Sequence, residues 1–241
     1  MLTVFFNELR ILKIQFYYAK TFFAYFCKLK FEMQAKIPSI IKSVFFNQVW
    51  TIPNNEKKIY LSFDDGPIPE VTPWVLNILK QYNVKATFFC IGDNVRKYPE
   101  VFKQIISEGH QIANHSFNHL NGWQTNSGKY IENVLEAENE ISKHTNSSLK
   151  LFRPPYGKIK PNQSYKLRKL GFKIIMWDII SKDYDVNLLP INCELNVIQN
   201  VSSGSIIIFH DSKKASKNLS GSLPSVIEKL QKAGYTFGLL S

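Results

Sequence analysis

The sequence predicts a single-domain α/β fold in which parallel strands alternate with helices. Seven short apolar segments are separated by segments of helical periodicity, a pattern typical of a parallel sheet with helical crossovers. The length of 241 residues fits one α/β barrel. Polar and charged side chains gather where the apolar segments end, and in an α/β barrel these ends form one rim.

The predicted strands are short and mostly apolar. They are expected at residues 58–63, 85–91, 111–114, 149–152, 172–177, 205–209 and 235–240. No internal repeat or low-complexity linker interrupts the series, which favours one domain over residues 58–241. Residues 33–57 form a lead-in segment in this prediction.

Each predicted helix has an apolar face or a boundary signal. The first has apolar residues at i, i+3, i+4, i+7, i+8 and i+11 counted from Val71, which is one face of a helix. Pro99 suits the first turn of the second helix, and Gly109 ends it. Gly171 and Gly234 follow later helices. The predicted ranges are 71–82, 99–108, 130–144, 161–170, 188–201 and 224–233.

The composition excludes several classes of protein. With 44% hydrophobic and 20% charged residues, the chain is neither disordered nor collagen-like. Cys27, Cys90 and Cys193 form no Cys-x-x-Cys pair, so neither a disulfide framework nor a cysteine metal site is predicted. The net charge of +11 indicates a basic surface. Without a nucleic-acid-binding motif, we expect no nucleic-acid partner.

Residues 1–32 differ from the rest of the chain. Ten of them are aromatic, but Arg10, Lys13, Lys20 and other basic residues interrupt every apolar run. Neither a transmembrane span nor a secretory signal with a cleavage site is predicted. This extension is either a basic aromatic helix on a membrane surface or an untranslated stretch before a start at Met33. We favour the second interpretation, expect a monomer and assign no cell compartment.

His115, His119 and Asp65 are the predicted metal ligands. A spacing of four residues places two imidazoles on one side of a helical turn, which suits a metal ion. Asp65 follows the first predicted strand on the same rim and completes a two-His, one-carboxylate set with an open position. Such a layout belongs to catalytic centres, because structural zinc sites are closed. Alone, the histidine pair is equally consistent with a solvated or capping role.

Two adjacent carboxylates, Asp64 and Asp65, close the first predicted strand. In a regular strand their side chains point to opposite faces, but the following turn at Gly66 and Pro67 could bring both into one pocket. One carboxylate would then bind the metal while the other acts as a base. A solvated Asp-Asp-Gly-Pro turn is the alternative interpretation.

Candidate catalytic groups also follow three later strands. Arg153 could hold a carboxylate through charge-assisted hydrogen bonds, and the backbone N–H of Tyr156 could face a developing oxyanion. His210 ends an apolar strand and is a candidate acid, and Asp183 could orient it or raise its pKa. The alternatives are a turn with a surface arginine and a structural histidine.

Together these segments resemble the motifs of the polysaccharide deacetylases, the NodB-homology group or carbohydrate esterase family 4. The resemblance covers residues 59–240, with a looser fourth motif in which Ser-Lys-Asp-Tyr stands where the family often has Arg-Asp-Trp. The matching segments, in motif order, are residues 61–67 (LSFDDGP), 115–119 (HSFNH), 153–157 (RPPYG), 181–184 (SKDY) and 208–210 (IFH).

The resemblance implies a distorted (β/α)7 TIM-like barrel and a metal-dependent hydrolase. Its substrate would be an acetylated polysaccharide or oligosaccharide, from which it removes acetyl groups, N-acetyl foremost. The implied cofactor is one divalent ion, Zn²⁺ first, with Co²⁺, Fe²⁺ and Ni²⁺ as alternatives. The implied roles are base for Asp64, alignment of the base for Arg153, acid for His210 with Asp183, oxyanion donor for Tyr156, metal ligands for Asp65, His115 and His119, and sugar contacts for Trp123, Tyr156 and Tyr184.

Two other functions remain open at this point. A short, closed pocket would favour an amidohydrolase that acts on a small non-peptide amide, whereas an open groove lined by Trp123 and Tyr184 would favour a sugar. A catalytically inactive glycan-binding or membrane-associated protein is disfavoured because the whole polar set is intact. The sequence does not choose among chitin oligomers, peptidoglycan, xylan and lipid-linked sugars.

Overall fold

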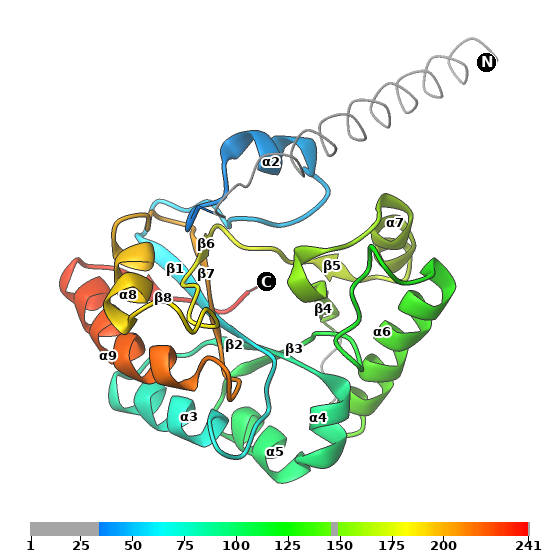
Figure 1. Cartoon of the computed structure of the whole chain (residues 1–241), viewed down its shortest axis with the longest axis horizontal. Helices are drawn as coiled ribbons and strands as arrows, with labels where there is room; N and C mark the ends of the chain where they lie inside the picture. The colour runs from blue at the N-terminus through cyan, green and yellow to red at the C-terminus, as the bar shows by residue number, and fades with distance from the viewer. Residues whose placement is uncertain (1–33, 146–148, 241) are drawn as a thin grey trace. The chain divides into compact units, whose positions relative to one another are not determined.

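A parallel sheet forms the centre of the fold (Figure 1). The computed structural model describes residues 34–145 and 149–240, so the predicted extension at residues 1–32 lies outside the described residues. Within them, the strand order is β5-β4-β3-β2-β1-β7-β6, with β8 beside β1, and neighbouring strands are parallel. The predicted α/β barrel is confirmed as a half-barrel. The strands are β1 (Lys58–Asp64), β2 (Thr87–Cys90), β3 (Gln111–Asn114), β4 (Leu151–Phe152), β5 (Lys173–Ile174), β6 (Ile179–Ile180), β7 (Ile206–His210) and β8 (Thr236–Phe237).

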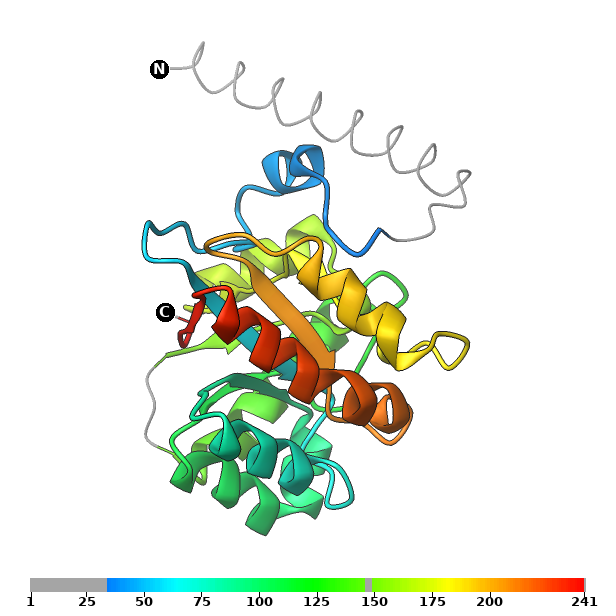
Figure 2. The same cartoon turned by 90° about the vertical axis from the view of Figure 1, so that its left-hand side faces the viewer.

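Helices connect the strands and cover the sheet from outside (Figure 1). Figure 2 shows α8 and α9 side by side, next to β7. None of the helices in the described ranges is both long and apolar enough to cross a membrane. The helices are α2 (Ser39–Val44), α3 (Thr72–Gln81), α4 (Gly92–Lys97), α5 (Pro99–Ser107), α6 (Ser127–Ser142), the 3₁₀ turn η1 (Pro155–Gly157), α7 (Pro161–Lys169), α8 (Pro190–Ile198) and α9 (Ser216–Lys232).

Strand β1 shows how the sheet divides its side chains between two faces. Ile59, Leu61 and Phe63 pack in the apolar cluster that includes residues of α3, α5 and α9. Ser62 and Asp64 occupy the alternate positions and are also buried. Because side chains alternate along a strand, these two polar residues face the interior of the half-barrel. The strand therefore delivers a buried carboxylate to the sheet's carboxyl end.

The lead-in segment lies between the two edge strands, β5 and β6. The Val49 N–H donates to the carbonyl at the end of β5 (2.8 Å), and the Val49 carbonyl accepts from the Met176 N–H (2.7 Å). From α2, Lys42 forms an ion pair with the buried carboxylate of Asp178. Two further backbone hydrogen bonds join Ile37 to Asp178 and Ile180 to Ala35. This segment is therefore part of the sheet's closure.

The strand predicted at residues 172–177 is shorter in the structure, where β5 covers only Lys173–Ile174. Pairing with β4 ends at Ile174, and β6 follows as a separate strand. Between β5 and β6 the backbone forms hydrogen bonds with the lead-in segment. Asp178 is buried there, and its carboxylate accepts a hydrogen bond from the Ser205 hydroxyl (2.6 Å). With only two residues, β6 is too short to show a sequence period.

Two helix predictions also need correction, and two short helices were not predicted. Helix α9 begins at Ser216, so Pro224 lies inside it. The proline costs about 3 kcal/mol, but burying Leu219 and Leu223 completely contributes about 1.5–3 kcal/mol each and outweighs it. Helix α6 begins before residue 130, because the Asn126 side chain caps the Gly128 N–H. The short helices α2 and α4 have six residues each, too few for an amphipathic pattern.

Candidate active site

The predicted polar residues converge on one rim of the sheet. Asp64 ends β1 and His210 ends the neighbouring strand β7, and the two are direct partners in register. His115 follows β3, and Arg153 follows β4. Asp183 follows β6 and reaches His210. Side chains far apart in the sequence thus share one site, as expected for strand ends of an α/β barrel.

Asp65, His115 and His119 form a cluster whose candidate ligand atoms lie within 4.8 Å of one another. Asp65 Oδ1 is 3.3 Å from His119 Nε2 and 3.7 Å from His115 Nε2. Asp65 has a φ of 83°, so the chain leaves the strand geometry there. Its side chain consequently shares a site with Asp64, whose Oδ2 is 3.9 Å from His115 Nε2.

The two histidines do not lie on a helical turn, so that part of the sequence argument is wrong. Residues 115–119 form a loop with positive φ at Ser116 (63°) and His119 (55°). The left-handed backbone at these two positions folds the loop back on itself. The imidazole rings are brought together, with centres 5.0 Å apart, by a different local geometry from the predicted one.

The chemistry of this cluster fits a divalent metal ion. His115 Nδ1 lies 2.8 Å from the Arg153 carbonyl, which can only accept, so Nδ1 carries the proton and Nε2 keeps its lone pair. Burial lowers the pKa of His115 to about 4, which keeps the ring neutral. Burial alone would raise the pKa of Asp65, but the hydrogen bond from His119 and the charge of His210 hold it below its ordinary value.

Asp64 is held by a buried arginine. Arg153 Nη1 donates to Asp64 Oδ1 (2.6 Å) and to Ser62 Oγ (2.9 Å), and Nη2 donates to the Met176 carbonyl (3.0 Å). The guanidinium also lies over the Phe89 ring, 3.8 Å from its centre. Arg153 is fully buried, so these contacts fix both the arginine and one oxygen of Asp64.

His210 is paired with a second buried carboxylate. Its Nδ1 lies 2.7 Å from Asp183 Oδ1, and its backbone N–H donates to Asp183 Oδ2 (2.7 Å). Ser181 Oγ donates to the same carboxylate at 3.0 Å. Burial alone would lower the pKa of His210, but the charge and hydrogen bond of Asp183 raise it to about 9. His210 is therefore protonated at neutral pH.

The three aromatic residues predicted to contact a sugar lie in different surroundings. Tyr156 is 61% exposed, and its ring is 4.6 Å from that of His119. Tyr184 is half-buried, with its ring 5.1 Å from that of His210. Trp123 is exposed and its Nε1 donates to the Ile159 carbonyl (3.3 Å). Two tyrosines thus adjoin histidines of the site, while the tryptophan is held by the chain near residue 159.

Asp211 is a site residue to which the sequence argument assigned no role. Its fully buried carboxylate accepts from the Gly66 N–H (3.0 Å) and the Thr72 hydroxyl (2.6 Å). A Cβ at Gly66 would lie 2.0 Å from Asp211 Oδ2, which explains the glycine. Asp211 anchors the loop that carries Asp65. Its place directly after His210 at a strand end was the available signal.

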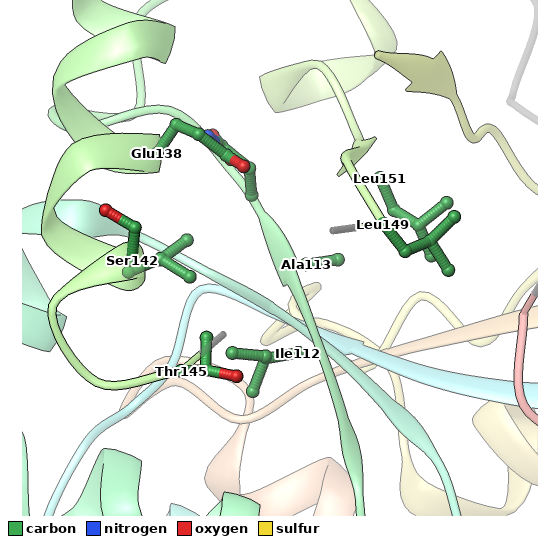
Figure 3. A pocket seen from close by; sticks show the side chains of 9 residues that line it. Ile112, Ala113, Glu138, Ser142, Thr145, Leu149 and Leu151 are labelled. Atoms are coloured by element: carbon green, nitrogen blue, oxygen red, sulfur yellow. The ribbon is translucent and has the colours of Figure 1, made fainter. Parts of the chain in front are cut away.

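Two cavities lie apart from these residues. One of about 20 Å³ lies between α6 and the strands β3 and β4, where Glu138, Ile112 and Leu151 are among its lining residues (Figure 3). The other, of about 210 Å³, lies between α3 and α9 and is lined in part by Trp74 and Lys217. Neither lining includes a residue predicted for the site.

An α/β half-barrel with a clustered Asp-His-His set and two buried carboxylate pairs on its rim defines a class of metal-dependent hydrolases. The chain belongs to the polysaccharide deacetylase family, whose profile matches residues 51–175. The resemblance seen in the sequence motifs is thereby confirmed.

Individual relatives agree with this assignment. A peptidoglycan-N-acetylglucosamine deacetylase of Bacillus cereus is 35% identical over 193 residues, which cover 80% of this chain and 90% of that protein. A chitooligosaccharide deacetylase of Azorhizobium caulinodans is 33% identical and covers 68% of this chain and 78% of its own length. A solved peptidoglycan N-acetylglucosamine deacetylase superposes with a TM-score of 0.77 at 33% identity, over 80% of this chain and 91% of that one.

Proposed function

We propose that this protein is a metal-dependent deacetylase that removes N-acetyl groups from a glycan. One observation carries the proposal: the Asp-His-His cluster, the Asp64–Arg153 pair and the His210–Asp183 pair share one rim. The named activities of the relatives support it. A base, an acid and a metal set can together hydrolyse an unreactive amide.

Asp65, His115 and His119 would hold the metal ion. Nitrogen and carboxylate ligands in this number favour Zn²⁺ at a catalytic centre, with Co²⁺, Fe²⁺ and Ni²⁺ as alternatives. When bound, such an ion supplies a Lewis acid that polarises a carbonyl and makes water more acidic. The chain prepares the site by keeping His115 neutral and Asp65 ionised.

Asp64 is the general base in this proposal. Arg153 occupies its Oδ1, which leaves Oδ2 on the side of His115 to take a proton from the attacking water. Because the arginine is buried and fully engaged, the carboxylate keeps its orientation between turnovers. General-base catalysis of this kind contributes about 10²–10⁴-fold to a rate.

His210 is the general acid, and the backbone N–H of Tyr156 is the oxyanion donor. With Nδ1 bound to Asp183, His210 has Nε2 as the atom that donates a proton to the departing amine. Tyr156 has a φ of 60°, and its ring contacts His119, which supports a position beside the reacting carbonyl. Loss of one oxyanion donor typically costs about 2.7–4 kcal/mol of transition-state stabilisation.

The test is acetate release by the full chain from acetylated glycans, measured after chelation and again after metal is added back. We expect release that depends on metal and that Asp64→Asn reduces by about 10²–10⁴-fold while the metal content stays unchanged. An active Asp64→Asn protein would overturn the assignment of the base. A folded, metal-loaded protein that releases acetate from no glycan would favour the small-amide or glycan-binding alternatives.

A further inference from the structure

A row of side chains leads outwards from each of two histidines on the rim. In the first row, the Tyr156 ring meets the His119 ring edge-on, with centres 4.6 Å apart. Lys158 Nζ then lies 5.9 Å from the centre of the Tyr156 ring and 5.4 Å from that of Trp123. The Tyr156 ring thus lies next to both the proposed metal ligand and the ammonium group.

The second row repeats this order at the other histidine. The Tyr184 ring meets the His210 ring edge-on, with centres 5.1 Å apart. Lys214 Nζ lies 5.8 Å from the centre of the Tyr184 ring. Both the proposed metal ligand His119 and the proposed acid His210 are therefore followed by a tyrosine and then by a lysine at nearly the same spacing.

Neither ammonium group forms an ion pair within the part of the chain that the structure describes. No carboxylate there lies within 4.0 Å of Lys158 or Lys214, whereas the adjacent Lys213 is paired with Glu70. An aromatic face attracts a cation without neutralising it. The two rows therefore end in positive charges that can still pair with an anion.

In each row a tyrosine is followed by a lysine, and in an acidic glycan a sugar ring is followed by a carboxylate. The exposed ring of Tyr156 and the half-buried ring of Tyr184 each offer an apolar face to a sugar ring, and the neighbouring ammonium group can pair with a carboxylate on the next residue. We propose that Lys158 and Lys214 are specificity residues that select glycans with a carboxylate next to the sugar that is deacetylated. This inference rests on the proposed function, and it concerns the choice of glycan at the same site.

Such a carboxylate has two chemical sources. It can belong to a lactyl ether on the neighbouring sugar, or to a peptide attached through that ether. The relatives named above include deacetylases of both peptidoglycan and neutral chitooligosaccharides, so family membership does not decide between acidic and neutral glycans. The substrates in the experiment must separate all three cases.

The experiment measures kcat/KM for acetate release with the full metal-loaded chain on three glycans of equal length. One is a neutral N-acetylglucosamine oligomer, the second carries free lactyl carboxylates on alternate sugars, and the third carries peptides on those lactyl groups. The quantity compared is the preference ratio, which is kcat/KM for an acidic glycan divided by kcat/KM for the neutral one.

The variants are Lys158→Gln, Lys214→Gln and the double variant. Lys213→Gln removes the same charge from a lysine that already has a partner and serves as the control.

We expect the wild-type protein to prefer an acidic glycan by about tenfold or more. An exposed ion pair contributes up to about 1 kcal/mol, so each single variant should lower the preference ratio about threefold to fivefold and the double variant by about the product. The preference should also shrink as salt is added. The control should keep the wild-type ratio. Preference for the second glycan would identify the lactyl group as the source of the carboxylate, and preference for the third would identify the peptide.

Two results would overturn the inference. If the wild type releases acetate from all three glycans at equal kcat/KM, the proposed function stands and the selection by lysine is wrong. If Lys158→Gln and Lys214→Gln lower kcat/KM equally for neutral and acidic glycans, the lysines hold the aromatic rings in position and do not select the glycan. Release from none of the glycans would remove the proposed function, and this inference with it.

Discussion

His115 and His210 lie on the same rim, but their pKa values are shifted in opposite directions. His115 donates from Nδ1 to the neutral carbonyl of Arg153, and burial lowers its pKa to about 4. His210 binds the carboxylate of Asp183 through Nδ1, and its pKa rises to about 9 although burial acts against this. At His210 the carboxylate bound to Nδ1 outweighs burial, whereas at His115 burial outweighs the more distant carboxylates of Asp64 and Asp65.

The largest expected effect on turnover comes from removing the imidazole ring of His115 or of His210. His115→Ala should lose both the metal and turnover, because the cluster keeps only two ligands. His210→Ala should bind metal like the wild type and lose about 10²–10⁴-fold in kcat, since only proton donation is removed. Metal analysis of the purified variants, together with acetate release, separates the two roles. A full equivalent of tightly bound metal in His115→Ala would contradict the comparison.

A smaller effect should follow when the partner of His210 becomes neutral. Asp183→Asn keeps a hydrogen-bonding side chain but removes the charge that raises the pKa of His210 above its ordinary value. In the pH profile of kcat/KM, the fall on the alkaline side should therefore move to lower pH by about one unit or more. Asp185→Asn, in the same loop, is the matched control and should leave the limb in place. An unmoved limb in Asp183→Asn would show that another group sets it.

The free energy of unfolding of the metal-free protein should respond to pH at both ends of the range. The folded pKa of His115 lies below 6.5, so stability falls as the pH drops from 6.5 towards 4. The folded pKa of His210 lies above 6.5, so its contribution is complete below pH 6.5 and is lost as the pH rises through about 9. Between pH 7 and pH 5, and between pH 7 and pH 9.5, each change amounts to roughly 2 kcal/mol.

Urea unfolding of chelated protein at pH 5, 7 and 9.5 measures both changes. His115→Gln should flatten the acid side of the profile, and His210→Gln should flatten the alkaline side. If both variants flatten the same side, the two histidines do not have opposite shifts.

The sequence predicted the fold wherever a pattern was long enough to read. The helix from Val71 shows its full apolar face and appears as α3, and the alternation of strands and helices gave the correct fold class. Strand β6 has only two residues, and Pro224 concealed the first half of α9. In that helix, tertiary burial of Leu219 and Leu223 outweighs the local signal.

For the site, residue types and strand ends were more informative than local geometry. Asp65, His115 and His119 come together as the sequence argument anticipated, but through left-handed backbone positions that no spacing rule reveals. The roles of Arg153 and Asp183 were suggested by charge, and the structure places each beside its expected partner. Asp211 received no role because its partners, Gly66 and Thr72, become neighbours only in the folded chain.

The lead-in segment has a consequence for the solubility of fragments. A fragment that began at β1 would contain every proposed catalytic residue but would lack the backbone groups that pair with Met176 and with the end of β5. Unpaired strand edges are templates for association between molecules. The buried carboxylate of Asp178 would also lose Lys42. Residues 35–52 therefore cover strand edges at which molecules could otherwise associate, a role that is separate from catalysis.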